Sequence, residues 1–326
     1  MNNSIKLLVS KDDNGKRLDI FLSKKIDTFT RSFIKKLIEL ENVKVNDKSI
    51  ISPSTKIRTG DKIDFKSIVI NEKKINPSKI NLNIIFEDKD LLIIDKPKGL
   101  IVHPGAGNYK NTLANGLAYK YKKNLSDING KLRPGIVHRI DKETSGLLVV
   151  AKNNETHAKL GKQFSDHTIK RKYVCLAWGV IRPLSGRIEN FISRSKKNRQ
   201  LMTVSDFKGK KAITNYKTIK VFDKKDIPKI SLIECELETG RTHQIRVHLK
   251  YKGSSILGDN KYGKKKLNFR KVNKTFQDRL HKIRGQALHA QTLEFVHPKK
   301  NRWVRFESEI PVDFKKMLSF LNNLYS

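Results

Sequence analysis

Residues 133–152 read RPGIVHRIDKETSGLLVVAK and bring a turn, a cluster of charges and a core strand into one short stretch. A Pro-Gly pair opens the stretch, and the apolar run LLVVA near its end predicts a buried strand. If residues 137–141 are extended, Arg139 and Asp141 point to one side and His138 to the other. Burying charged side chains beside a core strand costs free energy, so such residues are usually paired with an opposite charge or kept for a function. The stretch therefore carries either a structural ion pair or a functional site, and the spacing favours neither.

A second unusual stretch, ETGRTHQIRVHLKYKG, covers residues 238–253. Gly240 predicts a turn at the end of a strand, and Thr242 is a candidate cap for a short helix near 242–250. An arginine such as Arg246, held near the start of a helix, can bind a carboxylate or a phosphate. Taken alone, the stretch favours the other interpretation, a basic helix exposed on the surface.

The chain around these two stretches alternates between strand and helix patterns without the regular order of a doubly wound parallel sheet. The sequence therefore predicts an α+β fold. Strands are expected at 91–95, 147–151, 173–180, 212–221, 232–238, 287–295 and 303–306, and helices at 113–118, 154–164 and beyond residue 310.

The first part of the chain predicts a small separate domain that contains helices and a hairpin. Helical spacing marks a short helix near 17–22 and a second helix at 30–40, where Thr30 is a candidate cap. A turn at residues 46–47 between short apolar runs predicts a hairpin. Arg31, Lys35 and Lys36 fall on the outer side of the second helix, which is either an ordinary solvated face or a surface for phosphates. We expect domains at 1–75 and 84–326, joined by a linker at 76–83.

The net charge indicates a polyanionic partner. The chain has 326 residues, with 69 Lys and Arg against 32 Asp and Glu, a formal net charge of +37. Such an excess, spread over both expected domains, favours nucleic acid over an anionic membrane, because no long basic amphipathic helix is present. No apolar run approaches the ~18 residues of a membrane span, and no signal peptide opens the chain. The sequence therefore predicts a soluble, cytoplasmic protein.

The sequence offers no ligand set for a metal ion or a cofactor. Its two cysteines are too few for a disulfide framework or a cysteine-based metal cluster. His243 and His248 are five positions apart, which does not match the i,i+4 pair of a helical zinc site. We expect neither a metal nor a cofactor.

Three segments, taken in order, carry a resemblance to a known family. LIIDKPKGLIVHPGAGN (92–108), GIVHRIDKETSGLLVVAK (135–152) and TGRTHQIRVHL (239–249) resemble the RluA-type pseudouridine synthases. The string IVHPGAGN is most similar to the RluD branch, which modifies large-subunit ribosomal RNA. The resemblance extends from about residue 84 to about residue 310, with Ile140 where the family usually has leucine. Ahead of it, the segment from Gly15 to Phe65 resembles the alpha-L RNA-binding domain of a small-subunit ribosomal protein.

The resemblance implies an RNA isomerase with a mixed, mainly antiparallel sheet. Such enzymes break the N1–C1′ bond of uridine and rejoin the base through C5, without a cofactor or a metal. The match identifies Asp141 as the catalytic aspartate, either as nucleophile at C1′ or as base at the ribose. Tyr173 matches the tyrosine that stacks on uracil and is a candidate relay for the C5 proton, and Arg246 matches the arginine that pairs with the aspartate.

The remaining expectations concern RNA binding. A base stacked inside RNA must be flipped out before it can react, and Arg139 matches the arginine that fills the space left behind. We expect the partner to be large-subunit (23S) ribosomal RNA or a ribosomal precursor particle. A non-catalytic RNA-binding or ribosome-assembly protein is the alternative. The residues expected to contact RNA are Arg139, His138, Arg31, Lys35 and Lys36.

Overall fold

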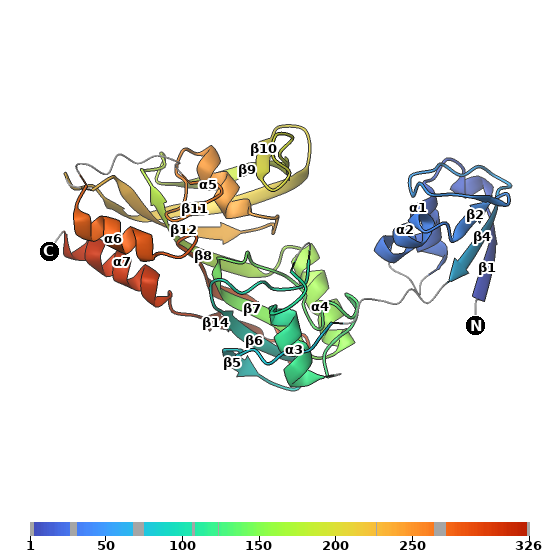
Figure 1. The fold of residues 1–326 in the computed structure, drawn as a ribbon, viewed down its shortest axis with the longest axis horizontal. Coiled ribbons are helices and arrows are strands. Elements are labelled where there is room, and N and C mark those ends of the chain that lie inside the picture. Colours follow the sequence, from blue (N-terminus) through green and yellow to red (C-terminus); the bar gives the residue numbers. More distant parts are fainter. Residues whose placement is uncertain are drawn as a thin grey trace. The chain divides into compact units, whose positions relative to one another are not determined.

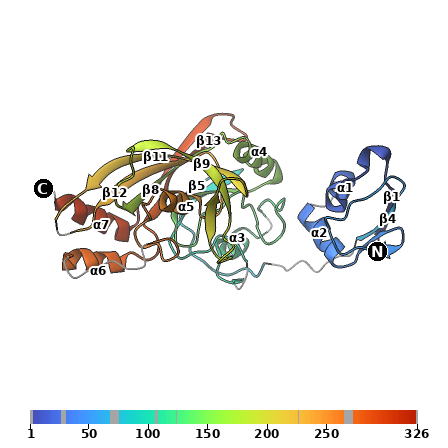
Figure 2. The same cartoon turned by 90° about the horizontal axis from the view of Figure 1, so that it is seen from above.

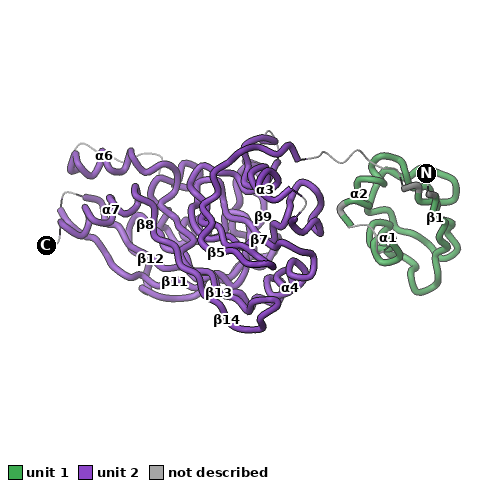
Figure 3. The backbone as a smooth tube through the Cα atoms, turned by 90° about the horizontal axis from the view of Figure 1, so that it is seen from below, with its two compact units in different colours: residues 1–72 green, residues 73–326 purple. Residues whose placement is uncertain are grey.

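A computed structural model describes residues 3–26, 31–67, 75–105, 108–122, 124–225, 227–263 and 272–324. The chain divides into two compact units, Met1–Glu72 and Lys73–Ser326, which Figure 3 shows in different colours. Each unit has a hydrophobic core of its own. We therefore treat the two units separately.

The smaller unit packs two helices, α1 (Leu18–Lys25) and α2 (Arg31–Glu39), against a small antiparallel sheet. Asn46 and Asp47 have positive φ angles of 49° and 63°, as the tight turn of a two-residue hairpin requires. Both helices and this hairpin are predicted from the sequence, whereas the first strand is not. Thr30, the expected cap of α2, lies outside the described residues. The sheet runs in the order β1 (Asn3–Leu8), β4 (Lys62–Ser67), β2 (Val43–Val45) and β3 (Lys48–Ser49).

The larger unit is built on one long mixed sheet, which confirms the predicted α+β class (Figure 1). Neighbouring strands pair antiparallel except β13 with β7, which run parallel. Gly146 sits in that parallel pair with a φ of 109°, where a side chain would collide with the carbonyl oxygen of Ala290. The strand order is β10 (Met202–Ser205), β9 (Ser185–Arg194), β11 (Lys210–Phe222), β12 (Ile230–Leu237), β8 (Lys170–Trp178), β13 (Leu288–Val296), β7 (Ser145–Ala151), β6 (Leu91–Lys96) and β5 (Ile84–Glu87), and β14 (Trp303–Glu307) pairs with β13.

Three helices of the larger unit, α3, α4 and α6, begin at residues whose side chains cap them. The side chains of Thr112, Asn153 and Asn273 each accept a backbone hydrogen bond from the first turn of the helix that follows. Two helices, α6 and α7, lie side by side at the C-terminal end of the unit (Figures 1 and 2). The helices are α3 (Leu113–Tyr121), α4 (Asn154–Ser165), α5 (Gln244–Tyr251), α6 (Lys274–Lys282) and α7 (Val312–Asn323).

The segment 76–83, expected as a linker, lies extended along the larger unit. The side-chain amide of Asn115 in α3 donates to the carbonyl oxygen of Asn76 at 2.7 Å. Gly116 leaves room for this segment, because a Cβ at that position would lie 2.9 Å from the Cβ of Ile80. The polar, Lys- and Asn-rich composition around this segment gives no sign of these apolar contacts.

None of the helices in the described part of the chain is both long enough and apolar enough to cross a membrane.

Candidate active site

Asp141 lies in an irregular segment that leads into β7, and buried Lys96 holds the chain beside it. The Nζ of Lys96 donates to the carbonyl oxygens of Pro97 at 2.7 Å, Leu100 at 2.9 Å and Lys142 at 3.0 Å. These acceptors satisfy all three N–H groups of an ammonium ion. Burial nevertheless lowers the pKa of Lys96 to about 7. The contact with the residue after Asp141 fixes the backbone from which the carboxylate projects.

The turn between β12 and α5 positions Arg246 beside Asp141. The helix begins after His243, which has left-handed backbone angles and no capping hydrogen bond, so the predicted cap at Thr242 is wrong. Instead, the side chain of Gln244 accepts from the backbone N–H of Arg241 at 2.9 Å. Gln244 is almost fully buried, so its amide fixes the turn from the core side.

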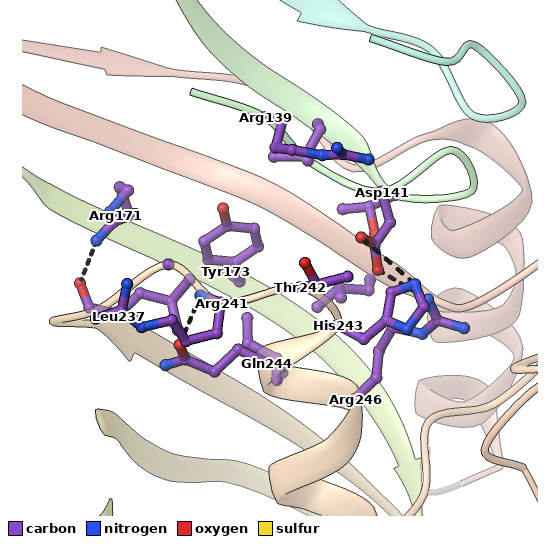
Figure 4. A pocket seen from close by; sticks show the side chains of 15 residues that line it. Arg139, Asp141, Arg171, Tyr173, Leu237, Arg241, Thr242, His243, Gln244 and Arg246 are labelled. Atoms are coloured by element: carbon purple, nitrogen blue, oxygen red, sulfur yellow. Dashed lines mark hydrogen bonds and ion pairs between the residues drawn. The ribbon is translucent and has the colours of Figure 1, made fainter. Parts of the chain in front are cut away.

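Arg246 joins two carboxylates that are far apart in the sequence. Its Nη1 donates to Oδ2 of Asp141 at 2.8 Å, as Figure 4 shows. Its Nε and Nη2 donate to the two oxygens of Asp259 at 2.7 and 2.9 Å. The pairing of Arg246 with Asp141 is the arrangement expected from the sequence. Asp259 was not expected, because nothing in its local sequence marks it as a partner of α5.

The charges of this group are mutually stabilised. Burial alone would lower the pKa of Arg246, but its hydrogen bonds and the negative charges of Asp259 and Asp141 raise that pKa above its usual value. Burial would likewise raise the pKa of Asp259, but the bonds from Arg246 and from two backbone N–H groups lower it. A buried carboxylate thus holds the arginine in place, and the third donor of that arginine remains for Asp141.

Tyr173 lies on β8 in the middle of the sheet and lines the same pocket. Its neighbours across the sheet are Cys235 on β12 and Ala290 on β13. Figure 4 shows Asp141 and Arg246 joined on one side of the pocket, with the ring of Tyr173 further along it. Burial raises the pKa of Tyr173, so its hydroxyl is protonated at neutral pH. An aromatic face and a carboxylate therefore border one cavity, as binding and attacking a nucleoside require.

Arg139 is exposed and also lines the pocket. Its Nη1 lies 3.2 Å from Nε2 of His103. Burial, together with the charges of Arg133 and Arg139, lowers the pKa of His103 to about 4. The imidazole is therefore neutral and can accept a hydrogen bond from Arg139, which leaves the other donors of the guanidinium available.

His138 is not brought to the site. Its Nε2 accepts a hydrogen bond from the backbone N–H of Val149 at 3.1 Å, and its ring lies against Phe164 with centroids 4.7 Å apart. Burial lowers its pKa to about 3. Through these contacts the side chain of His138 supports β7, and its expected contact with RNA stays a prediction.

The three basic residues of α2 lie in the smaller unit. Arg31 and Lys35 contact Asp19, at 2.9 and 3.5 Å, while Lys36 is exposed. Their side chains project from one helix, as the sequence predicts. The described residues do not place them relative to Asp141.

The sequence did not predict two further residues at the site: Arg171, which lines the pocket, and Tyr262, which contacts Arg246. The Nη2 of buried Arg171 donates to the carbonyl oxygens of Leu237 and Glu238 at 3.3 and 3.2 Å. The ring of Tyr262 lies 4.9 Å below the guanidinium of Arg246. The string GDNKYG at 258–263 contains Tyr262, but its local pattern does not indicate a contact with Arg246.

Within the described ranges, no group of three or more His, Cys, Asp or Glu side chains is placed to hold a metal ion.

Comparisons with known proteins identify the family of the chain. The family model for RNA pseudouridylate synthase matches residues 90–251, which include Asp141, Tyr173 and Arg246. The "Ribosomal large subunit pseudouridine synthase D" of Zymomonas mobilis is 43% identical over 310 residues, covering 94% of each chain. An "Uncharacterized RNA pseudouridine synthase YlyB" of Bacillus subtilis is 39% identical over 320 residues, covering 98% of each chain.

The solved structure of human RNA pseudouridylate synthase domain containing 4 has the same fold, with a TM-score of 0.56 over 74% of this chain and 93% of that one. Its sequence identity is 24%, so this likeness concerns the fold alone. The curated relatives cover almost the whole chain at a much higher identity. The chain therefore belongs to the RluA-type RNA pseudouridine synthases, and it is an enzyme that isomerises uridine in RNA to pseudouridine.

Proposed function

We propose that the enzyme modifies uridines of large-subunit ribosomal RNA in the cytoplasm, with Asp141 as its catalytic carboxylate. The observation that carries the assignment of Asp141 is the ion pair of 2.8 Å with buried Arg246, at the wall of a pocket that Tyr173 also lines. The RNA class is supported by the name of the relative from Zymomonas mobilis, "Ribosomal large subunit pseudouridine synthase D". The net charge of +37 suits so large a polyanion.

The reaction needs a carboxylate and a place for the base to turn. When the N1–C1′ bond breaks, its electron pair stays with the uracil, and Asp141 acts either as nucleophile at C1′ or as base at the ribose. The uracil then rotates, C5 forms the new bond to C1′, and the proton lost from C5 is balanced by one gained at N1. Atoms and electrons balance within the nucleoside, so no redox partner is required.

Arg139 and Tyr173 supply the remaining contacts. An exposed guanidinium at the pocket can stack between bases in the position that the flipped uridine leaves. The ring of Tyr173 offers a face on which the uracil can stack after the N1–C1′ bond breaks and before the C5–C1′ bond forms. Asp141, Arg139 and Tyr173 thus divide attack, extrusion and retention of the base among them.

The smaller unit is proposed to bind RNA in the manner of an alpha-L domain. Its second helix presents Lys36 to solvent, beside Arg31 and Lys35, whose charges Asp19 only partly compensates. This unit carries no residue assigned to the chemistry. We expect it to strengthen binding rather than to take part in the reaction.

The decisive experiment is to incubate ribosomal RNA that lacks this modification with the protein and to map pseudouridines by carbodiimide-dependent primer extension. Wild type should introduce stops at specific uridines of the large-subunit RNA. Asp141→Asn should introduce none, while its RNA affinity stays within a few-fold of wild type, because losing one negative charge does not weaken phosphate binding. Modification by Asp141→Asn near the wild-type rate would remove Asp141 from the chemistry. New stops confined to another RNA class would reject the proposed substrate.

A further inference from the structure

We infer that His243 is a further catalytic residue, whose Nε2–H donates a hydrogen bond to the O2 carbonyl oxygen of the target uracil as the N1–C1′ bond breaks. The inference rests on the proposed function, since it assumes a uridine beside Asp141. It deepens that function by assigning the group that receives the charge of the departing base.

The position of His243 is fixed by the turn that precedes α5. Its backbone is left-handed, with φ at 57° and ψ at 21°, and the side chain lines the pocket. Nε2 lies 4.0 Å from Oδ1 of Asp141, which is too long for a hydrogen bond. The carboxylate therefore does not engage this nitrogen, although Figure 4 shows the two side chains next to each other.

The other ring nitrogen determines where the proton sits. Nδ1 of His243 lies 2.8 Å from the hydroxyl oxygen of Tyr262, and that oxygen already accepts from the backbone N–H of Met202 at 2.8 Å. Tyr262 is only 3% exposed, so its O–H proton needs an acceptor inside the protein, and Nδ1 provides one. This assignment leaves the ring proton on Nε2, the nitrogen nearer Asp141.

The chemistry explains why a donor is useful there. When N1 leaves C1′, the electron pair spreads from N1 onto the carbonyl oxygens of the uracil. O2 is the carbonyl oxygen nearest C1′, because its carbon is bonded directly to N1. A donor next to the carboxylate that works at C1′ or the ribose is therefore within reach of O2. A donor held in place before the reaction stabilises such a charge without further reorganisation.

The donor is a neutral imidazole. Burial lowers the pKa of His243, the positive charges of Arg246 and Lys261 lower it further, and the negative charges of Asp141 and Asp259 act in the opposite direction. The N–H that faces the substrate is therefore present at neutral pH without an additional proton. The edge-to-face contact with Tyr262, with centroids 5.5 Å apart, holds the ring in this orientation.

Two substitutions separate this role from a structural one. His243→Asn suits the left-handed backbone and offers an amide oxygen to Tyr262 in place of Nδ1, but it has no group at the position of Nε2. His243→Gln extends an amide N–H to about that position. If His243 only anchors Tyr262, Asn should behave like wild type. If it contacts the uracil, Asn should lose activity and Gln should recover part of it.

The experiment measures single-turnover rates at saturating enzyme on a synthetic RNA that carries the uridine mapped above. The target is uridine, 2-thiouridine or 4-thiouridine, because sulfur is a poorer acceptor than oxygen. We expect His243→Asn to slow the uridine reaction about 100-fold. We also expect 2-thiouridine to slow wild type but not to slow His243→Asn further. The 4-thiouridine control should affect both proteins equally. Circular dichroism melts of each variant should match wild type.

Each contrary result has a defined meaning. A wild-type rate for His243→Asn, or an equal 2-thiouridine penalty in both proteins, overturns the assignment of His243 alone. Absence of pseudouridine with wild type on ribosomal RNA overturns the proposed function and this inference with it.

Discussion

Arg246 is the residue on which the charges of the site depend. Arg246 is only 5% exposed, and its guanidinium binds Asp259 with two nitrogens while the third binds Asp141. Burying charges is favourable only when their geometry and hydrogen bonds are complete. The planar fork of arginine meets both carboxylates at once, which the single ammonium of lysine cannot do.

Two substitutions of Arg246 should therefore distinguish the effect of its positive charge from the effect of its bridging geometry. We expect Arg246→Lys to keep most RNA affinity but to lower the single-turnover rate at saturating enzyme by at least ~10-fold, because the lysine can pair with only one carboxylate well. Arg246→Ala should in addition destabilise the protein by about 3–5 kcal/mol, since it leaves Asp259 buried without its partner. Lys252→Ala, on the exposed end of the same helix segment, is the control. Equal rates for Arg246→Lys and Lys252→Ala would show that the bridging geometry has no role.

The residues of the site differ in how far the sequence predicts them. The ion pair of Asp141 with Arg246 was expected, and it formed although the two lie 105 positions apart. Asp259 and Tyr262 were not expected, because their contacts with Arg246 arise only when the loop after α5 folds back. The alternation across residues 137–141 predicted that His138 and Asp141 lie on opposite sides, and His138 contacts Val149 and Phe164.

At the scale of elements, the two helices of the smaller unit are joined by one buried acid. The carboxylate of Asp19 on α1 has no exposed surface, and it accepts from Arg17 at 3.0 Å and from Arg31 on α2 at 2.9 Å. Burial alone would raise its pKa, but the hydrogen bonds from Arg17 and Arg31 lower it to about 2. The ion cluster thus fixes the helix that carries the proposed RNA-binding residues.

This cluster predicts a specific pH dependence. Because the folded pKa of Asp19 lies below its ordinary value of 3.8, its stabilisation is complete above about pH 4 and is lost as the pH falls towards 2. We expect Asp19→Asn to lower the urea midpoint of the smaller unit at pH 7, followed through the methyl NMR signals of Leu18 and Leu22. The difference from wild type should shrink between pH 4 and pH 2. Asp47→Asn, at an exposed turn, should leave the midpoint unchanged. A constant difference at every pH would contradict the assignment.

Elements with a strong apolar pattern were predicted, and elements with a polar one were missed. Strand β7 is buried at every position, and its apolar run stands out in the sequence. In β9 only Ile188 and Ile192 are buried, and in α6 only Phe276 is. Their remaining positions are exposed or only partly buried, so pairing with β11 or α7 decides their structure rather than local periodicity.

At the scale of the whole molecule, the positive charge is unevenly divided. Residues 1–72 hold 15 basic and 10 acidic residues, a net charge of +5, whereas residues 73–326 hold 54 and 22, a net charge of +32. Most of the positive charge that attracts RNA therefore lies in the larger unit, and the proposed RNA binding by the smaller unit would add local contacts rather than bulk charge.

The division of the chain determines where a truncation can be made. Deleting residues 1–72 removes the smaller unit alone, whereas deleting residues 1–80 also removes the Asn76 carbonyl that binds Asn115 and the Ile80 side chain that lies on Gly116. We expect the melting temperature of the larger unit to be unchanged by the first deletion and lowered by the second. Equal melting temperatures would show that the stretch removed only by the longer deletion contributes nothing to the fold of the larger unit.

The shorter deletion also measures what the smaller unit contributes to substrate binding. If α2 binds phosphates through Lys36 and its neighbours, removing residues 1–72 should weaken binding to ribosomal RNA. It should also make the plot of log affinity against log salt shallower, by about 0.7–0.9 for each phosphate that the protein no longer neutralises. Because Asp141, Tyr173 and Arg246 all remain, the single-turnover rate at saturating enzyme should stay within a few-fold of the full chain.

Lys36→Ala in the full chain should make the salt dependence of RNA affinity shallower by the amount expected for about one phosphate, with Lys48→Ala on the exposed strand β3 as the control. An unchanged affinity and slope after the deletion would show that the smaller unit does not bind RNA, whereas loss of the saturating rate would mean that it acts on the reaction itself.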